Sequence, residues 1–406
     1  MVINPTKTVN ELITALPYII DIEDGRKIYH SWRVAILSGL CAKGPVGPGE
    51  LKYIFYAALL HDIGGVGFPI HIIHYLKRND KISHNILLSH PIVGAQLVSN
   101  IPQMNPAAKI ILDHHEWING HGYPRAKFGD SISFGSQVIR IADSIDIFLQ
   151  TTRTRTLKQL KDKMSPNIDK EYSKDLFHRA FRILEKDRFF YKILPRKNVP
   201  LIFKEIHEEI GLLKIPAKID AVGKTLEFVA QIVDMKHPFT SGHSLRVSRY
   251  AMAIALAMSL GHDEVTRIRW AGLLHDIGKL SVSRHILDKP TTLNHEEYQK
   301  IQKHAHQTFV IMNMIPSLRD IALIAAAHHE RFDGSGYPFS LSKEGIPRSA
   351  RILALCDAFD AMTSNRPYRK PLTFEEACRE IKKMSGTQFD PEIINYALPV
   401  FRSSGF

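Results

Sequence analysis

The sequence predicts an all-α protein built from two tandem helical domains. Apolar residues recur at three- and four-residue steps through most of the chain, and few segments show the two-residue alternation of a half-buried strand. The length of 406 residues suits two domains, each of roughly 200 residues. An ordered set of histidines and aspartates also occurs twice, which indicates an internal duplication.

The duplicated set has constant spacing, because every member of the second copy lies 214 residues after its counterpart. The motif LLHDIG at 59–64 recurs at 273–278, and GYP at 122–124 recurs at 336–338. A further histidine precedes each copy, one residue out of register: His30 and His243. The first copy comprises His61, Asp62, His90, His114, His115 and Asp143, and the second comprises His275, Asp276, His304, His328, His329 and Asp357.

The individual helices follow from periodicity and stop signals. Segments around 51–63, 265–277 and 318–329 are expected to be buried helices. In RVSRYAMAIALAMSLG, apolar residues recur at helical steps and Gly261 ends the helix. His243 lies four residues before Val247, which places it on the same inward face. The stretches WINGHGYP and RFDGSGYP are expected to be loops because they are rich in Gly, Asn, Asp and Pro.

The domain boundary follows from the repeat. With the 214-residue offset, residue 406 corresponds to residue 192, and the basic segment LPRKNVP (194–200) follows. We therefore expect a first domain at 1–195 and a second at 205–406, the second beginning with a connecting helix through LIFKEIHEEIGLLK.

Composition narrows the class of protein. A hydrophobic content of 44% and a charged content of 23% are ordinary for a globular protein. No apolar run approaches the ~18 residues of a membrane helix, and no signal peptide is expected. Three cysteines suit a reduced cytoplasm. The net charge of +12 favours anionic partners, but the basic cluster at Arg153, Arg155, Lys158, Lys161 and Lys163 has few interleaved aromatics, so no nucleic-acid partner is expected.

Histidine and aspartate without thiolates suit iron, manganese or a catalytic zinc. Asp276 has two carboxylate oxygens and is the natural bridge between two metals. His243, His275 and Asp357 would complete one metal site, and His304, His328 and His329 the other. Two such metals can activate water and clamp an in-line phosphoryl displacement. The alternative, core or capping histidines, does not account for an ordered set that occurs twice.

These residues carry a family resemblance. The second half resembles an HD-GYP domain of the HD phosphohydrolase superfamily through HPFTSGHSLRV, LLHDIGKL, His304, HHERFDGSGYP and ALCDAFDAMTSNRPYR, spanning about 235–370. The resemblance implies a helical HD-type domain, a centre of iron or manganese ions, and hydrolysis of cyclic di-GMP or cyclic GMP-AMP. It also implies seven metal ligands: His243, His275, Asp276, His304, His328, His329 and Asp357.

The resemblance assigns substrate contacts as well. Lys279 matches the lysine that meets a substrate phosphate, so Asp276 and Lys279 are the expected catalytic residues. Arg366 and Arg369 fall in a phosphate-contacting loop, and guanidinium groups bind phosphate oxygens well. Gly336 and Tyr337 match the substrate-side loop, where the tyrosine would pack either on a base or within the loop.

Two departures from the family pattern concern the segment before His243. Members with three metals carry Glu where this chain has Phe239, so we expect two divalent ions. The family often has Asp where this chain has His237, which leaves substrate contacts on that side open.

The first copy keeps every ligand type but loses the phosphate-facing groups. Gly65 stands where the second copy has Lys279, and about six residues are missing where the second copy carries SNRPYRKP. We expect a degenerate domain that hydrolyses cyclic dinucleotide poorly or not at all. Its metal occupancy stays open, because the ligands could also form a buried hydrogen-bonded cluster.

The expected activity is therefore metal-dependent hydrolysis of a 3′-5′ phosphodiester in a cyclic dinucleotide, giving a linear 5′-phosphorylated product. The tandem-HD layout resembles that of the 3′,3′-cyclic GMP-AMP phosphodiesterases, and this resemblance implies cyclic GMP-AMP as the substrate, with cyclic di-GMP as close competitor. Asp333 and Asp360 are weak candidates for the general acid. A non-hydrolytic cyclic-dinucleotide receptor and an HD-type nucleotidase remain alternatives. A cytoplasmic location is expected, and a homodimer is one possibility.

Overall fold

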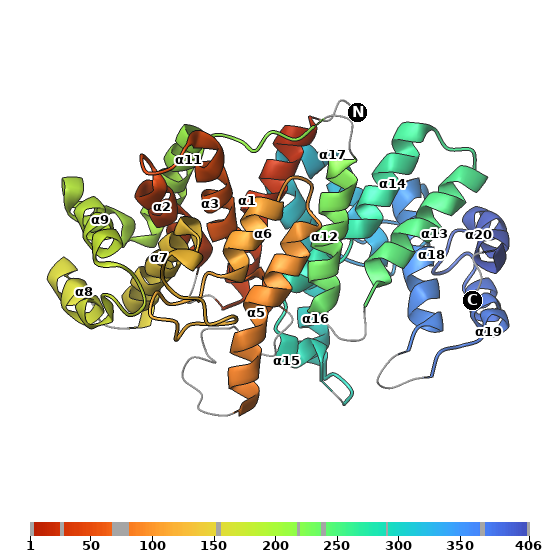
Figure 1. The fold of residues 1–406 in the computed structure, drawn as a ribbon. Helices are drawn as coiled ribbons and strands as arrows, with labels where there is room; N and C mark the ends of the chain where they lie inside the picture. Colours follow the sequence, from red (N-terminus) through yellow and green to blue (C-terminus); the bar gives the residue numbers. More distant parts are fainter. Residues whose placement is uncertain are drawn as a thin grey trace. The chain divides into compact units, whose positions relative to one another are not determined.

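The computed structural model describes residues 4–24, 28–66, 81–151, 156–216, 220–236, 241–289, 291–365 and 370–403. Over these residues the secondary structure is helical, and isolated β-bridges stand in place of any sheet. Figure 1 shows the helices in chain order. The predicted all-α fold is confirmed.

The described residues divide into two compact units, one within 4–224 and the other within 225–403. The helices of the first unit are α1 (Pro5–Asp24), α2 (His30–Ala42), α3 (Pro48–Leu60), α5 (Lys81–Ser99), α6 (Asn105–Leu112), α7 (Phe134–Thr151), α8 (Leu157–Met164), α9 (Lys174–Glu185), α10 (Phe189–Ile193) and α11 (Val199–Ile210).

The second unit repeats this order of elements. Its helices are α12 (Ala221–Met235), α13 (His243–Ala257), α14 (His262–Leu274), α15 (Arg284–Leu287), α16 (His295–Met314), α17 (Arg319–Ala326), α18 (Arg348–Thr363), α19 (Phe374–Lys383) and α20 (Pro391–Ser403). The pairs α2–α3, α5–α6 and α2–α7 pack together in the first unit, as α13–α14, α16–α17 and α13–α18 do in the second.

The boundary between the units lies later than the repeat offset suggests. We expected α11 to open the second domain, but it packs on the first unit. The ring of Phe203 stacks on Trp32 with centroids 4.3 Å apart. Asn10 on α1 then holds the following segment, because its side chain accepts from Leu213 N and donates to Leu213 O, each over 3.0 Å. The division therefore falls between Lys224 and Thr225, within α12.

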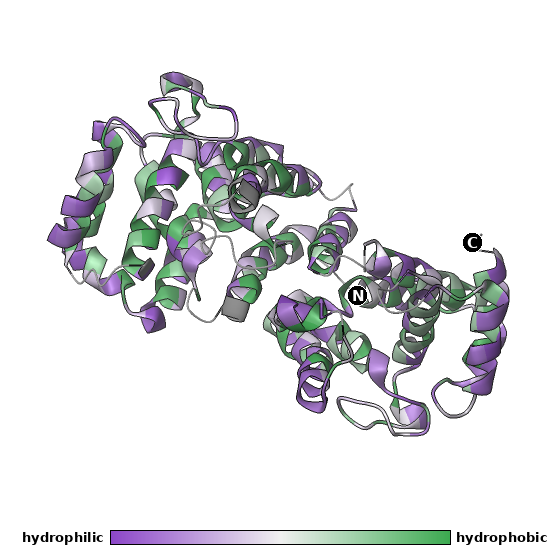
Figure 2. Ribbon diagram, turned by 90° about the horizontal axis from the view of Figure 1, so that it is seen from below, coloured by the Kyte–Doolittle hydropathy of each residue, from purple (hydrophilic) through white to green (hydrophobic). Residues whose placement is uncertain are grey.

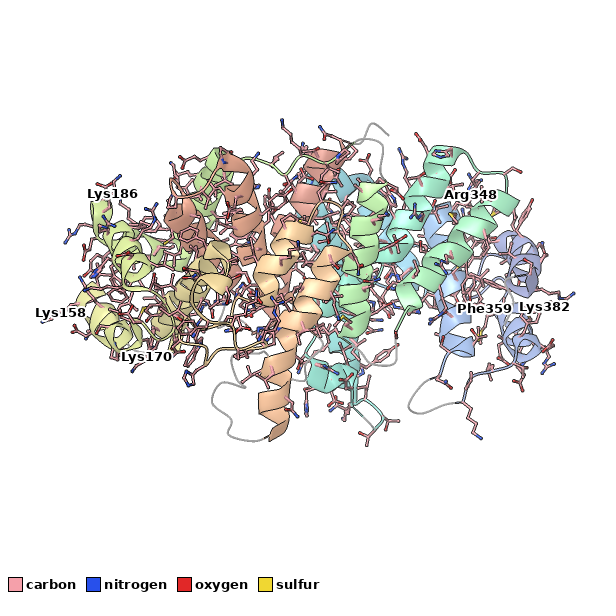
Figure 3. All side chains as sticks on the ribbon, viewed as in Figure 1. Lys158, Lys170, Lys186, Arg348, Phe359 and Lys382 are labelled. Atoms are coloured by element: carbon pink, nitrogen blue, oxygen red, sulfur yellow. The ribbon has the colours of Figure 1, made fainter. Side chains whose placement is uncertain are left out.

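Each unit has an apolar interior and a polar exterior (Figure 2). In the second unit, Phe359 on α18 is fully buried and stacks on Phe401 of α20 with ring centroids 3.8 Å apart. Lys158, Lys170 and Lys382 are exposed, and Figure 3 shows their side chains at the outside of their units. The basic charge therefore includes lysines spread over the solvated surface.

Membrane insertion has no candidate in the described part of the chain. None of the helices there combines the length and the apolar character that a bilayer-spanning segment requires.

The glycine of each LLHDIG motif allows two backbones to touch. A Cβ on Gly278 would lie 2.0 Å from the carbonyl oxygen of His304, and one on Gly64 would lie 2.2 Å from that of His90. Both contacts are far shorter than real Cβ contacts, so only glycine fits. The close approach brings the His-Asp dipeptide against the helix that carries the next histidine.

We expect Gly278→Ala to lower the free energy of unfolding by about 1–3 kcal/mol or more, because the added methyl must displace α16. The measurement is chemical denaturation followed by circular dichroism. Gly345→Ala is the control, since a Cβ there meets nothing within 4 Å, and it should change stability by less than about 0.5 kcal/mol. Equal stability of the two variants would refute the packing role of Gly278.

Candidate metal centres

The second unit gathers its predicted ligands from five segments. His243 opens α13, His275 and Asp276 follow the end of α14, and His304 lies within α16. His328 and His329 form a short 3₁₀ turn, Ala327–His329, directly after α17, and Asp357 lies within α18. A capping box at the start of α16 fixes the helix that carries His304, because Asn294 and Glu297 each accept from the other's backbone N–H over 2.9 and 2.8 Å.

The seven side chains meet in one cluster with two ends, of which His329 and Asp357 are partly exposed and the other five are buried. At one end, Nε2 of His243 lies 3.3 Å from Nε2 of His275 and 3.2 Å from Oδ1 of Asp357. At the other end, Nε2 of His304 lies 3.4 Å from Nε2 of His328. His329 offers a ligand atom within 4.8 Å of those of His304 and His328.

Asp276 lies between the two ends and turns one oxygen to each. Its Oδ2 is 3.4 Å from Nε2 of His275, and its Oδ1 is 3.4 Å from Nε2 of His304. A carboxylate in this position has the geometry required to bridge two cations. The role of Asp276 as a bridge between two metals stays a prediction.

Backbone carbonyls orient three of the histidines in the same way. The Nδ1 atoms of His275, His304 and His328 lie 2.7, 2.5 and 2.6 Å from the carbonyl oxygens of Gly272, Ile301 and Ala325, each three residues earlier. Because a carbonyl can only accept, Nδ1 carries the proton and Nε2 keeps its lone pair directed into the cluster. A hydrogen bond of this kind from the outer ring nitrogen is typical of metal-bound histidine.

For His243, a carboxylate accepts the Nδ1 hydrogen bond in place of a backbone carbonyl. Its Nδ1 donates to Oδ2 of Asp360 over 2.7 Å, and Asp360 also accepts from Nε of Arg246 over 2.6 Å. These bonds lower the pKa of Asp360 although burial opposes them. Asp360 therefore orients His243, and its lowered pKa favours the carboxylate form, which does not suit the general-acid role. Asp333 is exposed and its pKa is lowered by hydrogen bonds from Ser335, so it does not suit that role either.

The protonation states of His304, His329 and Asp276 suit cation binding, whereas His243 would release a proton when an ion binds. Burial lowers the pKa of His304 and of His329 to about 3, so both rings are neutral. Burial opposes ionisation of Asp276, but Lys279 and His275 hold its pKa well below the usual range. Burial also lowers the pKa of His243, but hydrogen bonds to Asp357 and Asp360 outweigh it and raise the pKa to about 9.

Unpaired buried atoms give a direct test of whether the clusters fit a metal. Oδ1 of Asp276 is buried without a hydrogen-bond partner, and so are Nε2 of His30 and Nε2 of His61 in the first unit. A buried acceptor left unpaired is costly. A divalent ion would satisfy each of these atoms, so the residues present fit the metal centre that the sequence analysis predicts.

Lys279 and Tyr337 lie beside the cluster. Nζ of Lys279 is 2.5 Å from Oδ2 of Asp276, and its side chain is 21% exposed. The ring of Tyr337 packs on His329 with centroids 4.9 Å apart. Gly336 is needed for packing, since a Cβ there would lie 2.3 Å from Arg331 N. Arg366, Arg369, His237 and Phe239 lie outside the described residues.

The first unit builds a cluster of the same kind. His30, His61 and Asp143 form one group, and Asp62 joins the second group with His90, His114 and His115. Asp62 again turns Oδ2 towards His61 and Oδ1 towards His90, over 3.5 and 3.6 Å. The Nδ1 atoms of His61, His90 and His114 again face the carbonyl three residues earlier.

Several supporting residues escaped the sequence analysis although they share the repeat. His30 Nδ1 lies 2.6 Å from Oδ2 of Asp146, the counterpart of Asp360. Glu330 and its counterpart Glu116 each accept two backbone N–H groups from the end of the GYP loop, over 2.6 to 3.0 Å. The repeat spacing could have identified them, because Asp146 and Asp360, like Glu116 and Glu330, are 214 residues apart.

A known protein family matches both halves of the chain. The HD domain family matches residues 18–167 and 227–393, which cover both clusters. The chain belongs to the HD domain family. This assignment supports the HD-type resemblance of both halves.

Named relatives and one solved structure extend the comparison. The 3′3′-cGAMP-specific phosphodiesterase 3 of Vibrio cholerae is 29% identical over 325 residues, covering 79% of this chain and 68% of that protein. A cyclic di-GMP phosphodiesterase of Thermotoga maritima is 40% identical over 177 residues, covering 43% of this chain and 48% of that protein. The crystal structure of a cyclic GMP-AMP specific phosphodiesterase of V. cholerae has a TM-score of 0.65 with 22% identity and covers 97% of both chains, which supports the fold.

We expect Asp360→Asn to weaken metal binding by about 10- to 100-fold, because the amide loses the charge that holds Nδ1 of His243 protonated and Nε2 directed inward. Titration of metal-free protein with Mn²⁺ measures the effect. Asp333→Asn, in the exposed loop, is the matched control and should bind as the unmodified protein does. An unchanged affinity in Asp360→Asn would show that His243 does not need this partner.

Proposed function

We propose that the second unit hydrolyses a 3′-5′ phosphodiester bond of a cyclic dinucleotide, and so ends a second-messenger signal. The observation that carries the proposal is the cluster around Asp276, in which two groups of imidazoles share one carboxylate and Lys279 lies at its partly exposed edge. The named activities of the relatives are of this reaction class. The proposal includes a cytoplasmic location, which this substrate class and three free cysteines favour.

The proposed metal ligands are His243, His275, Asp276, His304, His328, His329 and Asp357. Two divalent ions, iron or manganese, would supply Lewis acidity and lower the pKa of a water molecule. The chain itself holds the ligand atoms in place before any ion binds, through the Nδ1 hydrogen bonds described above. A site preorganised in this way does not have to rearrange during the reaction.

The proposed reaction is an in-line displacement at phosphorus. The oxygen of water forms a bond to phosphorus, the bond from phosphorus to the 3′ oxygen breaks, and one proton passes from water to that oxygen. The product is a linear dinucleotide with a 5′-phosphate. Lys279 stabilises negative charge on the non-bridging oxygens, and Arg366 and Arg369 are proposed to bind the phosphates.

We propose 3′,3′-cyclic GMP-AMP as the preferred substrate, with cyclic di-GMP as the competitor. The match to the 3′3′-cGAMP-specific relative covers 79% of this chain, whereas the match to the cyclic di-GMP relative covers 43%. Because its 325 aligned residues exceed the length of either unit, the match to the former extends over both units, which supports this preference.

The first unit is proposed to be non-hydrolytic. Gly65 replaces Lys279, so among the residues that the structure describes no lysine pairs with Asp62, whose side chain is 18% exposed against 4% for Asp276. Its proposed role is packing, ligand sensing or dimerisation.

The test of the proposed activity is incubation of Mn²⁺- or Fe²⁺-loaded protein with cyclic GMP-AMP, cyclic di-GMP and cyclic di-AMP separately, with products resolved by chromatography. We expect linear product from cyclic GMP-AMP at the highest rate, its loss in Asp276→Ala, and its retention in the matched variant Asp62→Ala. No product from any of the three, with metal confirmed bound, would favour a receptor or a nucleotidase instead.

We expect Lys279→Ala to reduce kcat by about 10²- to 10³-fold, because one charge facing the transition state is lost. Steady-state kinetics and metal analysis are measured together. Metal content should stay unchanged, and Lys382→Ala, at an exposed lysine on α19, should retain full activity. A rise in KM with kcat unchanged would show that Lys279 contributes equally to substrate and transition-state binding, and would exclude a role in stabilising the transition state.

A further inference from the structure

The two units differ at one position that faces the cluster from the helix carrying the last aspartate. In the first unit, α7 carries Arg140 three residues before Asp143, and in the second unit α18 carries Ala354 three residues before Asp357. The Arg140 side chain is only 13% exposed. Its Nη1 lies 3.0 Å from Nδ1 of His115 and 3.6 Å from Oδ2 of Asp143. A fixed positive charge therefore stands against two of the candidate ligands.

The contact with Arg140 changes what His115 can offer. A guanidinium group is always protonated and can only donate, so Nδ1 of His115 is the acceptor. In a neutral imidazole the proton then sits on Nε2. One nitrogen is engaged by Arg140 and the other carries a hydrogen, so neither keeps a free lone pair. This is the reverse of His61, His90 and His114, whose Nδ1 atoms donate to carbonyls and leave Nε2 free.

In the second unit the corresponding pair is His329 and Asp357, and α18 places Ala354, not a cation, at the position of Arg140. Nδ1 of His329 lies 4.0 Å from Oδ2 of Asp357, and Ala354 has no donor group. The side chain of Ala354 is a single methyl group, which leaves both His329 and Asp357 able to take part in the cluster.

Arg140 is held in place by a buried acid. Its Nε and Nη2 lie 3.0 and 2.5 Å from Oε2 of Glu171, on the segment that leads into α9. The second unit ties the equivalent segment through Arg351, which pairs with Asp390 just before α20. Arg351 corresponds to Gln137 in the repeat, about one helical turn before Arg140. The arginine that ties this segment therefore lies about one turn later on its helix in the first unit than in the second, and there its guanidinium group contacts the cluster.

We propose that Arg140 is an internal cation that takes the place of one metal ion in the first unit, so that this unit binds one ion fewer than the second. The inference rests on the proposed function for the assignment of two ions to the second unit. The second unit carries its cation, Lys279, beside the bridging carboxylate, where the first unit has Gly65. The first unit instead carries Arg140, which blocks His115 and Asp143. This difference accounts for a cluster that keeps every ligand type and does not turn over substrate.

The test is the number of manganese ions bound per chain, measured by elemental analysis after equilibrium dialysis of the full-length protein. Arg140→Ala should raise the content by about one ion per chain, because the freed lone pairs of His115 and Asp143 become ligands. The double variant Arg140→Ala/Glu171→Gln avoids leaving a buried carboxylate unpaired and should show the same gain if the single variant does not fold. Ala354→Arg should show the converse, a loss of about one ion.

Control variants separate this inference from the proposed function. Lys158→Ala removes an exposed cation on α8 and should leave the metal content unchanged. Asp276→Ala reports metal lost from the second unit, and its outcome bears on the proposed function alone. A folded Arg140 variant with the metal content of the unmodified protein would overturn the inference. So would an unmodified protein that binds two ions in each unit.

Discussion

A hydrogen bond donated by Nδ1 of eight buried histidines is the interaction on which both clusters depend. Imidazole has two nitrogens, and only the one without a proton can bind a cation. In His61, His90, His114, His275, His304 and His328 the carbonyl three residues earlier takes the Nδ1 proton. In His30 and His243 an aspartate that also pairs with an arginine performs this role. The helical backbone therefore sets both the tautomer and the direction of the ligand atom.

The rest of each unit serves to bring these oriented rings together. The glycine of the LLHDIG motif lets the His-Asp dipeptide contact the next histidine helix, and Glu116 or Glu330 fixes the loop that follows the histidine pair. Because the same devices occur in both units, duplication preserved the scaffold of the cluster. What differs is the position of the neighbouring cation, Lys279 in one unit and Arg140 in the other. Charge placement, more than ligand identity, distinguishes the two sites.

Much of this arrangement could be predicted from the sequence. The fold class followed from helical periodicity, and the cluster members followed from a spacing that occurs twice. The partner residues Asp146 and Asp360 share the same spacing, yet aspartates are common on helices and no rule of ligand chemistry singles them out. Arg140 could not be anticipated, because an arginine in a helix is ordinarily solvated and its inward direction depends on the tertiary pairing with Glu171. The position of α11 likewise depends on which unit covers its apolar face, as Phe203 shows.

The most direct test of this account is a crystal structure of the manganese-loaded protein, with anomalous scattering used to locate the ions. The account predicts two anomalous peaks on either side of Asp276, one beside His243 and His275 and the other beside His304 and His328. It predicts no more than one peak in the first unit. An empty second cluster, or the same number of fully occupied sites in both units, would contradict it.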